Sequence, residues 1–220
     1  QSETVWRQAD KYSVPRMAFV NKLDRVGSDF FAVLKEIRER LGAKAVALQI
    51  PWGRESEFVG VVDLVRMKSV KFDSANPAKT PEVGEIPADL KQQAATWRHH
   101  LLEGIAEYDD QLMEKYIHDQ APTEEDLIKG IRTATIQHGV VPVLCGASFR
   151  NIGTQPLLDA VCDYLPSPLD VPVPSAHNPY TDEAIPCAPD EHGAFAALAF
   201  KIATDPYVGK LYFLRVYSGT

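Results

Sequence analysis

The tetrapeptide Asn21-Lys22-Leu23-Asp24 contains the residue types and spacing that most directly suggest chemistry. An ionised aspartate has two acceptor oxygens and can receive two adjacent N–H donors at once. Guanine presents such a pair at its N1–H and 2-amino group, whereas adenine has no donor at either position. A site built around a hydrogen bond rejects ligands that cannot make it. The sequence therefore predicts that Asp24 reads guanine.

In this interpretation Lys22 contacts the face of the base and Asn21 connects the loops around it. A lysine stem can lie along the face of a base while its ammonium stays solvated. An asparagine amide can tie neighbouring loops together through its donors and its acceptor. From the residues alone, the alternative is a loop whose polar residues serve only turns and caps, because N-K-x-D is short enough to arise by chance.

The elements around the tetrapeptide favour the first interpretation. Residues 17–20 form a continuously apolar run, which is typical of a strand buried on both faces of a parallel sheet. The tetrapeptide follows the carboxyl end of that strand, and residues 28–41 predict a helix with Ser28 as N-cap and Gly42 at its end. This order is the unit of an α/β domain, in which ligands bind beyond the carboxyl ends of the strands.

A second strand and loop complete the predicted site. Residues 140–145 form another apolar strand, which leads into Gly146, Ala147 and Ser148 and then a helix over 155–164. Guanine-nucleotide domains close the base pocket with such a loop, in which a backbone N–H reaches O6 of the base. Small residues allow that close approach. The alternative is an ordinary strand-to-helix turn.

The segment between these two units predicts an inserted α+β subdomain over residues 42–138. We expect strands at 45–50, 58–65 and 69–72, a loop at 73–87, and helices at 88–107, 109–118 and 123–138. Seven prolines between 166 and 189 indicate an ordered linker, placed at 169–191. Residues 192–220 predict a hairpin, and because a lone hairpin is marginal, we interpret it as the first strands of a β-domain.

Composition excludes several classes of function. The chain of 220 residues is 45% hydrophobic with a net charge of -7, which argues against non-specific binding to a phosphate backbone. No apolar run reaches the roughly 18 residues of a membrane span. Cys145, Cys162 and Cys187 form no C-x-x-C pair, which suits a reducing, cytoplasmic compartment. The histidines form no H-x-x-x-H pattern, so no metal site is predicted.

Several motifs, spread over nearly the whole chain, resemble the elongation factor G family of translational GTPases. The resemblance rests on residues 1–9 (QSETVWRQA), 19–25 (FVNKLDR), 113–116 (MEKY), 155–161 (QPLLDAV), 163–168 (DYLPSP), 198–202 (LAFKI) and 205–211 (DPYVGKL).

This resemblance implies the C-terminal part of a P-loop GTPase domain at residues 1–41 and 139–168, with the start of a β-barrel domain at 192–220. It implies a ribosome-dependent GTPase that drives translocation of transfer and messenger RNA. Asn21, Lys22 and Asp24 would specify guanine, and Ala147-Ser148 would touch O6. The insert would match the family's extra subdomain, which is associated with the ribosomal stalk protein.

The chain also departs from the family pattern. The family usually has Ser then Ala in the base-contacting loop, where this chain has Ala147 then Ser148, which puts any bracing of Asp24 by that hydroxyl in doubt. The sequence has no G-x-x-x-x-G-K-[ST] motif, and in the family that motif lies upstream of Gln1. We therefore expect GTP or GDP with Mg²⁺ in the full-length parent, and no catalytic residue, no metal ligand and no tightly bound nucleotide in this chain.

Three alternatives remain at this stage. The first is a ribosomal-protection or recycling paralogue, which differs mainly in later domains. The second is a non-catalytic docking module that binds the ribosomal stalk through acidic helices around residues 103–110 and 124–126. The third is a metabolic α/β enzyme, for which no general acid or base beside a pocket stands out in the sequence.

Overall fold

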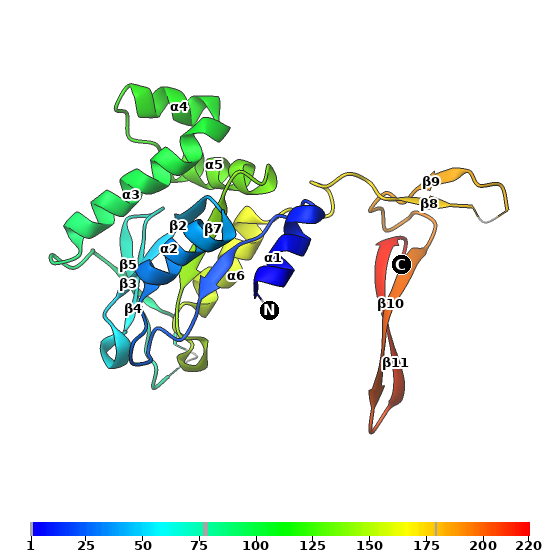
Figure 1. Cartoon of the computed structure of the whole chain (residues 1–220), viewed down its shortest axis with the longest axis horizontal. Helices are drawn as coiled ribbons and strands as arrows, with labels where there is room; N and C mark the ends of the chain where they lie inside the picture. The colour runs from blue at the N-terminus through cyan, green and yellow to red at the C-terminus, as the bar shows by residue number, and fades with distance from the viewer. Residues whose placement is uncertain (1, 77–78, 179) are drawn as a thin grey trace. The chain divides into compact units, whose positions relative to one another are not determined.

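The computed structural model describes residues 2–76, 79–178 and 180–220 (Figure 1). The chain divides into two compact units, Gln1–Leu165 and Pro166–Thr220. In chain order, the elements of the first unit are α1 (Ser2–Lys11), β1 (Ala18–Val20), α2 (Phe30–Leu41), β2 (Ala45–Ala47), β3 (Gln49–Trp52), β4 (Gly60–Asp63), β5 (Lys68–Lys71), β6 (Glu82–Gly84), α3 (Lys91–Ile105), α4 (Asp110–Ile117), α5 (Glu124–Ile136), β7 (Val141–Cys145) and α6 (Thr154–Tyr164). Those of the second are β8 (Ser175–His177), β9 (Ala184–Pro186), β10 (Ala196–Asp205) and β11 (Gly209–Ser218).

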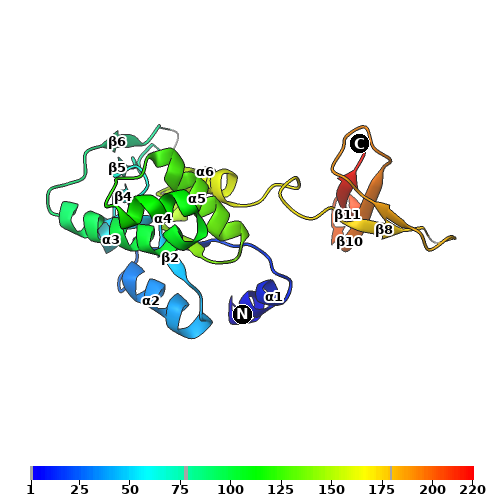
Figure 2. The same cartoon turned by 90° about the horizontal axis from the view of Figure 1, so that it is seen from above.

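The first unit is built on a parallel sheet with the strand order β1-β7-β2. Strand β7 is buried along its whole length, and Val20 of β1 lies opposite Cys145 of β7. Helices α2 and α6 lie on opposite faces of this sheet (Figure 2). Burial on both faces explains the unbroken apolar runs in the sequence. The predicted α/β class with a parallel sheet is confirmed.

A second sheet, antiparallel in the order β3-β4-β5-β6, begins where β2 ends. Leu48 belongs to both sheets, because its N–H donates to Val143 O at 2.9 Å and its carbonyl accepts from the N–H of Leu64 at 2.9 Å. The sequence predicted one strand over 45–50. The structure divides that segment at Leu48, because its two ends find partners in different sheets.

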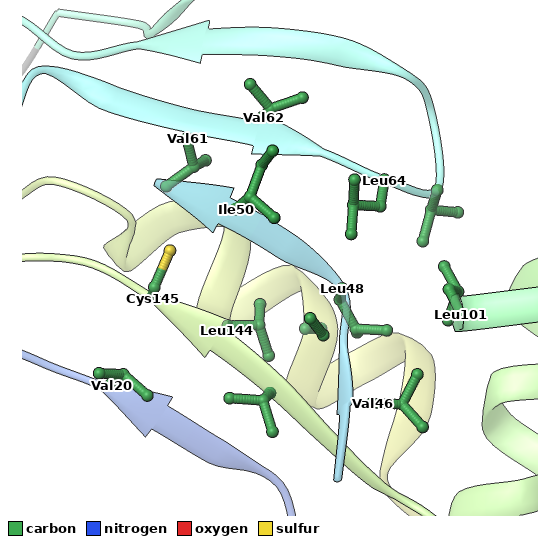
Figure 3. Close-up of a cluster of buried hydrophobic side chains, with 14 of the residues drawn as sticks. Val20, Val46, Leu48, Ile50, Val61, Val62, Leu64, Leu101, Leu144 and Cys145 are labelled. Carbon is green, nitrogen blue, oxygen red and sulfur yellow. The ribbon is translucent and has the colours of Figure 1, made fainter. Parts of the chain in front are cut away.

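One hydrophobic core joins the two sheets. Ile50 and Val61 are fully buried, and Leu144 is nearly so. Figure 3 shows these side chains on β3, β4 and β7, with Leu101 of α3 reaching the same cluster. The core therefore spans both sheets and holds them as one unit.

Asp29, rather than the predicted Ser28, is the N-cap of α2. The Asp29 carboxylate accepts hydrogen bonds from the N–H groups of Phe31 and Ala32 at 2.9 and 3.0 Å. A carboxylate is favoured over a hydroxyl there because the amino end of a helix carries positive partial charge. Ser28 instead donates its hydroxyl to Leu23 O at 2.9 Å. The predicted end of the helix at Gly42 is confirmed, with φ of 63°.

The loop predicted over 73–87 contains a strand. Strand β6 pairs with β5, and Ser69 Oγ donates to Glu85 O at 2.8 Å just beyond it. The sequence Glu82-Val83-Gly84 is exposed, follows Pro81 and ends in a glycine, so its pattern alone does not indicate a strand. Residues 77–78 of this segment lie outside the described residues.

Helices α3, α4 and α5 pack side by side (Figures 1 and 2). Helix α5 begins with a capping box in which Thr123 and Asp126 bond each other's backbone N–H. Asp126 also forms an ion pair of 2.5 Å with Lys115 of α4. Among the residues that the structure describes, no helix is long and apolar enough to cross a bilayer.

The second unit contains the predicted hairpin as β10 and β11, which pair in antiparallel register. Its apolar side chains are largely exposed, with Phe200 at 61% and Ile202 at 65%. The stretch interpreted from its prolines as a linker contains a short pair of strands, with Ser175 of β8 opposite Pro186 of β9. Proline tolerates the edge of such a pair because it only lacks a donor.

The capping box of α5 gives a pH-dependent prediction. Hydrogen bonds from Lys115 and Thr123 lower the pKa of the Asp126 carboxyl to about 2. Because the folded pKa lies below the ordinary value, Asp126 stabilises the fold above about pH 4 and loses that effect as the pH falls towards about 2. We expect Asp126→Asn to lower the free energy of unfolding by about 1 kcal/mol at pH 7.

Urea unfolding of wild type and variant at pH 7 and pH 3 checks this prediction. The difference between the two proteins should shrink at the lower pH. Glu125→Gln, in the same helical turn, is the matched control and should leave little difference at either pH. An Asp126→Asn effect that is equal at both pH values would contradict the ionic origin of the stabilisation.

Candidate base-recognition site

The six residues predicted for the site lie in two loops that leave the same edge of the parallel sheet. Asn21, Lys22 and Asp24 follow β1, and Gly146, Ala147 and Ser148 follow β7. The pairing of the strands continues into the loops, because Gly146 N–H donates to Val20 O at 3.0 Å and Leu23 N–H donates to Gly146 O at 3.2 Å. Parallel register therefore brings the two loops together at the carboxyl ends of the strands.

Asn21 and Ser148 join the two loops directly. Asn21 Nδ2 donates to Ser148 Oγ at 2.8 Å, and Asn21 Oδ1 accepts from Ser148 N–H at 2.9 Å. Asn21 Oδ1 also lies 3.1 Å from Ser148 Oγ and accepts from Lys22 N–H at 2.8 Å. The amide and the hydroxyl thus satisfy each other, and we call this contact the Asn21–Ser148 joint.

Asp24 follows Asn21 by three residues in the same loop, with its acceptors available. The residue is half-buried, and within the described part of the chain its carboxylate makes no hydrogen bond or ion pair. Leu23, only 4% exposed, anchors the loop between Lys22 and Asp24 in the core. Lys22 itself adopts a left-handed backbone with φ of 64°. The buried leucine fixes the loop while both charged neighbours stay accessible.

Two glycines make the second loop tight. A Cβ on Gly146 would lie 2.3 Å from Ile152 O and 2.6 Å from the ring of Phe19. Gly153 has φ of +82°, and its Cβ would lie 2.5 Å from Cys145 O. Gly146 was among the predicted site residues and Gly153 was not. Its role depends on a turn closing back onto β7, which the sequence alone does not reveal.

The backbone N–H groups predicted to reach a base already have partners in this structure. Ala147 N–H donates to Ile152 O at 2.9 Å, and Ser148 N–H donates to Asn21 Oδ1. A contact from either group to a base is therefore a shared or an exchanged hydrogen bond. Ser148 is the easier donor to redirect, because its acceptor is a side chain.

Sequence reasoning missed Phe149, whose side chain is 100% exposed. Phe149 follows Ser148 directly in the sequence, just as the exposed Lys22 follows Asn21. A fully exposed aromatic next to convergent polar groups is a common feature of ligand sites. The only signal in the sequence was an aromatic residue directly after three small ones.

The remaining ionisable groups do not add a catalytic arrangement to the site. Burial raises the pKa of the Cys145 thiol, so that residue is a neutral packing group at the end of β7. Among residues 2–76, 79–178 and 180–220, no group of three or more His, Cys, Asp or Glu side chains is placed to share a metal ion. The arrangement offers the Asn21–Ser148 hydrogen bonds and the acceptors of Asp24.

Comparison with known proteins assigns this arrangement to a family. Residues 1–167 match the model of the elongation factor Tu GTP binding domain. Elongation factor G of Amoebophilus asiaticus (strain 5a2) is 54% identical over 220 residues, which are 100% of this chain and 31% of that protein. The crystal structure of ttk003000868 from Thermus thermophilus is similar with a TM-score of 0.76 and 29% identity, over 99% of this chain and 29% of that one.

The chain therefore spans less than a third of the length of these relatives. The family resemblance drawn from the sequence motifs is confirmed by these similarities.

The Asn21–Ser148 joint can be tested by a double-mutant cycle. Because each side chain satisfies the other, Asn21→Ala and Ser148→Ala should each destabilise the chain, and the double variant should cost less than their sum. We expect a coupling of about 1 kcal/mol. Urea unfolding of the four proteins measures it. Thr154→Ala paired with Asn21→Ala is the control cycle and should be additive.

Proposed function

The chain belongs to the elongation factor Tu GTP-binding domain family, and on that premise we propose that it carries the guanine-recognising half of the GTP site of a translation elongation GTPase. The observation that supports the proposal most strongly is the Asn21–Ser148 joint beside an Asp24 carboxylate whose acceptors are available. Both lie beyond the carboxyl ends of paired parallel strands, where such domains bind ligands.

In this proposal Asp24 accepts the N1–H and the 2-amino group of guanine. The joint holds the two loops at a fixed separation before the base arrives, so little ordering remains to be done on binding. Lys22 and Phe149 supply flat apolar surface for the faces of the base. Ser148 N–H turns from Asn21 Oδ1 to O6 of the base, and the joint stays closed because Ser148 Oγ still accepts from Asn21 Nδ2.

The residues of this chain fit the base of the nucleotide and not its phosphates. The sequence contains no G-x-x-x-x-G-K-[ST] motif, and Gly209-Lys210 is followed by Leu211. Phosphates are held by backbone N–H groups and a lysine of that motif, and Mg²⁺ by a neighbouring hydroxyl. In the proposed whole protein, GTP or GDP with Mg²⁺ is therefore held jointly by this chain and by residues outside it.

The proposed domain boundaries follow the sequence prediction. Residues 1–41 and 139–168 are the partial GTPase domain, 42–138 the insert, 169–191 the linker and 192–220 the start of a β-barrel domain. The pairing of β2 bears on the boundary at residue 42, because Ala45–Ala47 pairs with β7 in the parallel sheet and not with the strands of the insert. This pairing supports a start of the proposed insert after β2 rather than at residue 42.

We further propose that the whole protein acts in the cytoplasm and promotes translocation of transfer and messenger RNA on the ribosome. The relative that supports this choice over a protection or recycling paralogue is named elongation factor G and is 54% identical across the whole chain, the insert included. The sequence of later domains would separate these alternatives, because the paralogues differ there.

The ribosomal stalk remains a proposed partner of the insert, with a smaller acidic face than the sequence suggested. Several of the carboxylates are engaged within the chain: Asp109 pairs with Lys129, Glu124 with Arg66, and Glu107 with Lys44. Asp110 and Glu125 are exposed and make no ion pair in the described part of the chain. These two residues are the ones to alter in a pull-down of the stalk protein.

The base-reading role of Asp24 predicts a change of specificity. In the whole protein, Asp24→Asn should weaken GDP binding about a hundredfold, because two charge-assisted hydrogen bonds are lost. It should favour xanthosine diphosphate, whose 2-position carries an acceptor. Fluorescent-nucleotide titration measures both affinities. Asp110→Asn, a matched loss of charge on α4, should bind as wild type, and an unchanged guanine preference in Asp24→Asn would refute the assignment.

The missing phosphate site predicts the behaviour of the chain by itself. Without groups that position the phosphates and the metal, there is no catalysis of phosphoryl transfer. We expect no ribosome-stimulated GTP hydrolysis by the 220-residue chain and only weak or undetectable binding of GDP. Phosphate release with ribosomes, and calorimetry with GDP, check the two expectations. Micromolar affinity or turnover would contradict them.

A further inference from the structure

A cavity of about 500 Å³ lies between α6 and the antiparallel sheet, away from the candidate base site. Leu48 and Leu144 line it where the two sheets meet, and Figure 3 shows both side chains. Val65 and Val70 add apolar wall from the antiparallel sheet. None of the six predicted site residues lines this cavity. Its size suits a small organic ligand.

Gln49 is the polar group that the fold leaves unexplained in this cavity. Gln49 lines the cavity and is only 3% exposed, and its Oε1, with less than 1 Å² of accessible surface, has no hydrogen-bond partner among the described residues. Buried polar atoms are almost always paired, and an unpaired one indicates a missing partner. Asp63, directly opposite Gln49 on β4, cannot supply it because its carboxylate is an acceptor already bonded to Val65 and Arg66.

Of the charged side chains that line the cavity, the cations have ion-pair partners, whereas two carboxylates of α6 have none in the described part of the chain. Arg66 pairs with Asp63 at 3.1 Å and with Glu124 at 2.8 Å, and Lys68 pairs with Glu85. Lys79, the third cation that lines the cavity, pairs with Glu82 at 3.0 Å. These cations are thus neutralised from within. Asp159 and Asp163 of α6 line the same cavity, and in the part of the chain that the structure describes they make no ion pair. The ligand that fits is positively charged.

We propose that this cavity binds an aliphatic polyamine. A terminal N–H donor reaches the carbonyl of Gln49, which supplies the missing partner, and the methylene chain lies on Leu48 and Leu144. Asp159 and Asp163 are one helical turn apart, so their side chains begin about 6 Å from each other. Successive nitrogens of a polyamine, separated by three or four methylene groups, have a similar spacing. An anion would be repelled by these two carboxylates, because the cations that line the cavity are already paired with other carboxylates.

Calorimetric titration of the 220-residue chain with spermidine tests the proposal, with 1,8-octanediol as an uncharged probe of similar length. We expect saturable binding of one spermidine and none of the diol. Asp163→Asn and Asp159→Asn should each weaken binding at least about threefold, because an ion pair is lost. Gln49→Leu should weaken it about tenfold and leave the far-ultraviolet spectrum unchanged.

Asp89→Asn separates a specific site from general attraction to a chain of net charge -7. Asp89 is exposed and does not line the cavity, so its variant should bind spermidine as wild type does. Absence of saturable binding at millimolar spermidine would overturn the proposal. So would equal weakening in Asp89→Asn, or binding of the diol as strong as that of spermidine. If Gln49→Leu fails to fold, the two α6 variants decide the question.

Discussion

The parallel pairing of β1 with β7 is the constraint on which the rest of the candidate site depends. Because Val20 lies opposite Cys145, β1 and β7 end at the same level of the sheet and the loops that follow them begin side by side. The ladder extends one step into the loops through Gly146. Two short polar sequences far apart in the chain become one surface only through this register. A slip of one residue would turn Asn21 and Ser148 away from each other.

The exchange of Ala147 and Ser148 relative to the family pattern has a structural consequence. A serine at position 148 places its hydroxyl against the Asn21 amide, and Ala147 is buried with a relative exposure of 1%. The hydroxyl therefore stabilises the asparagine rather than the aspartate. Asp24 keeps both oxygens for a ligand and lacks whatever bracing a serine at position 147 would provide. In this chain the hydroxyl of Ser148 therefore supports Asn21, the residue that joins the two loops.

Leu48 plays the corresponding part between the two sheets. Its N–H and its carbonyl serve different sheets, so the chain changes from parallel to antiparallel pairing at one residue. The cavity lined by Gln49 lies at this junction of the two sheets, between α6 and the antiparallel strands. The insert is thereby joined to the parallel sheet through shared backbone and a common core. A ligand in this cavity would contact both the insert and the parallel sheet.

The sequence by itself determined the features that depend on neighbouring residues in the chain, such as apolar strands and the end of a helix. Apolar runs predicted β1 and β7, Gly42 predicted the end of α2, and the order of strand, loop and helix predicted the α/β class. It named Ser28 as the cap of α2, where the structure has Asp29, and it did not reveal β6 or divide residues 45–50 between two sheets. It could name Asn21 and Ser148 but not the hydrogen bonds between them, and it gave no sign that Gln49 Oε1 has no partner among the described residues. Those features depend on which distant backbone and side-chain groups meet, and only the tertiary structure brings them within hydrogen-bonding distance.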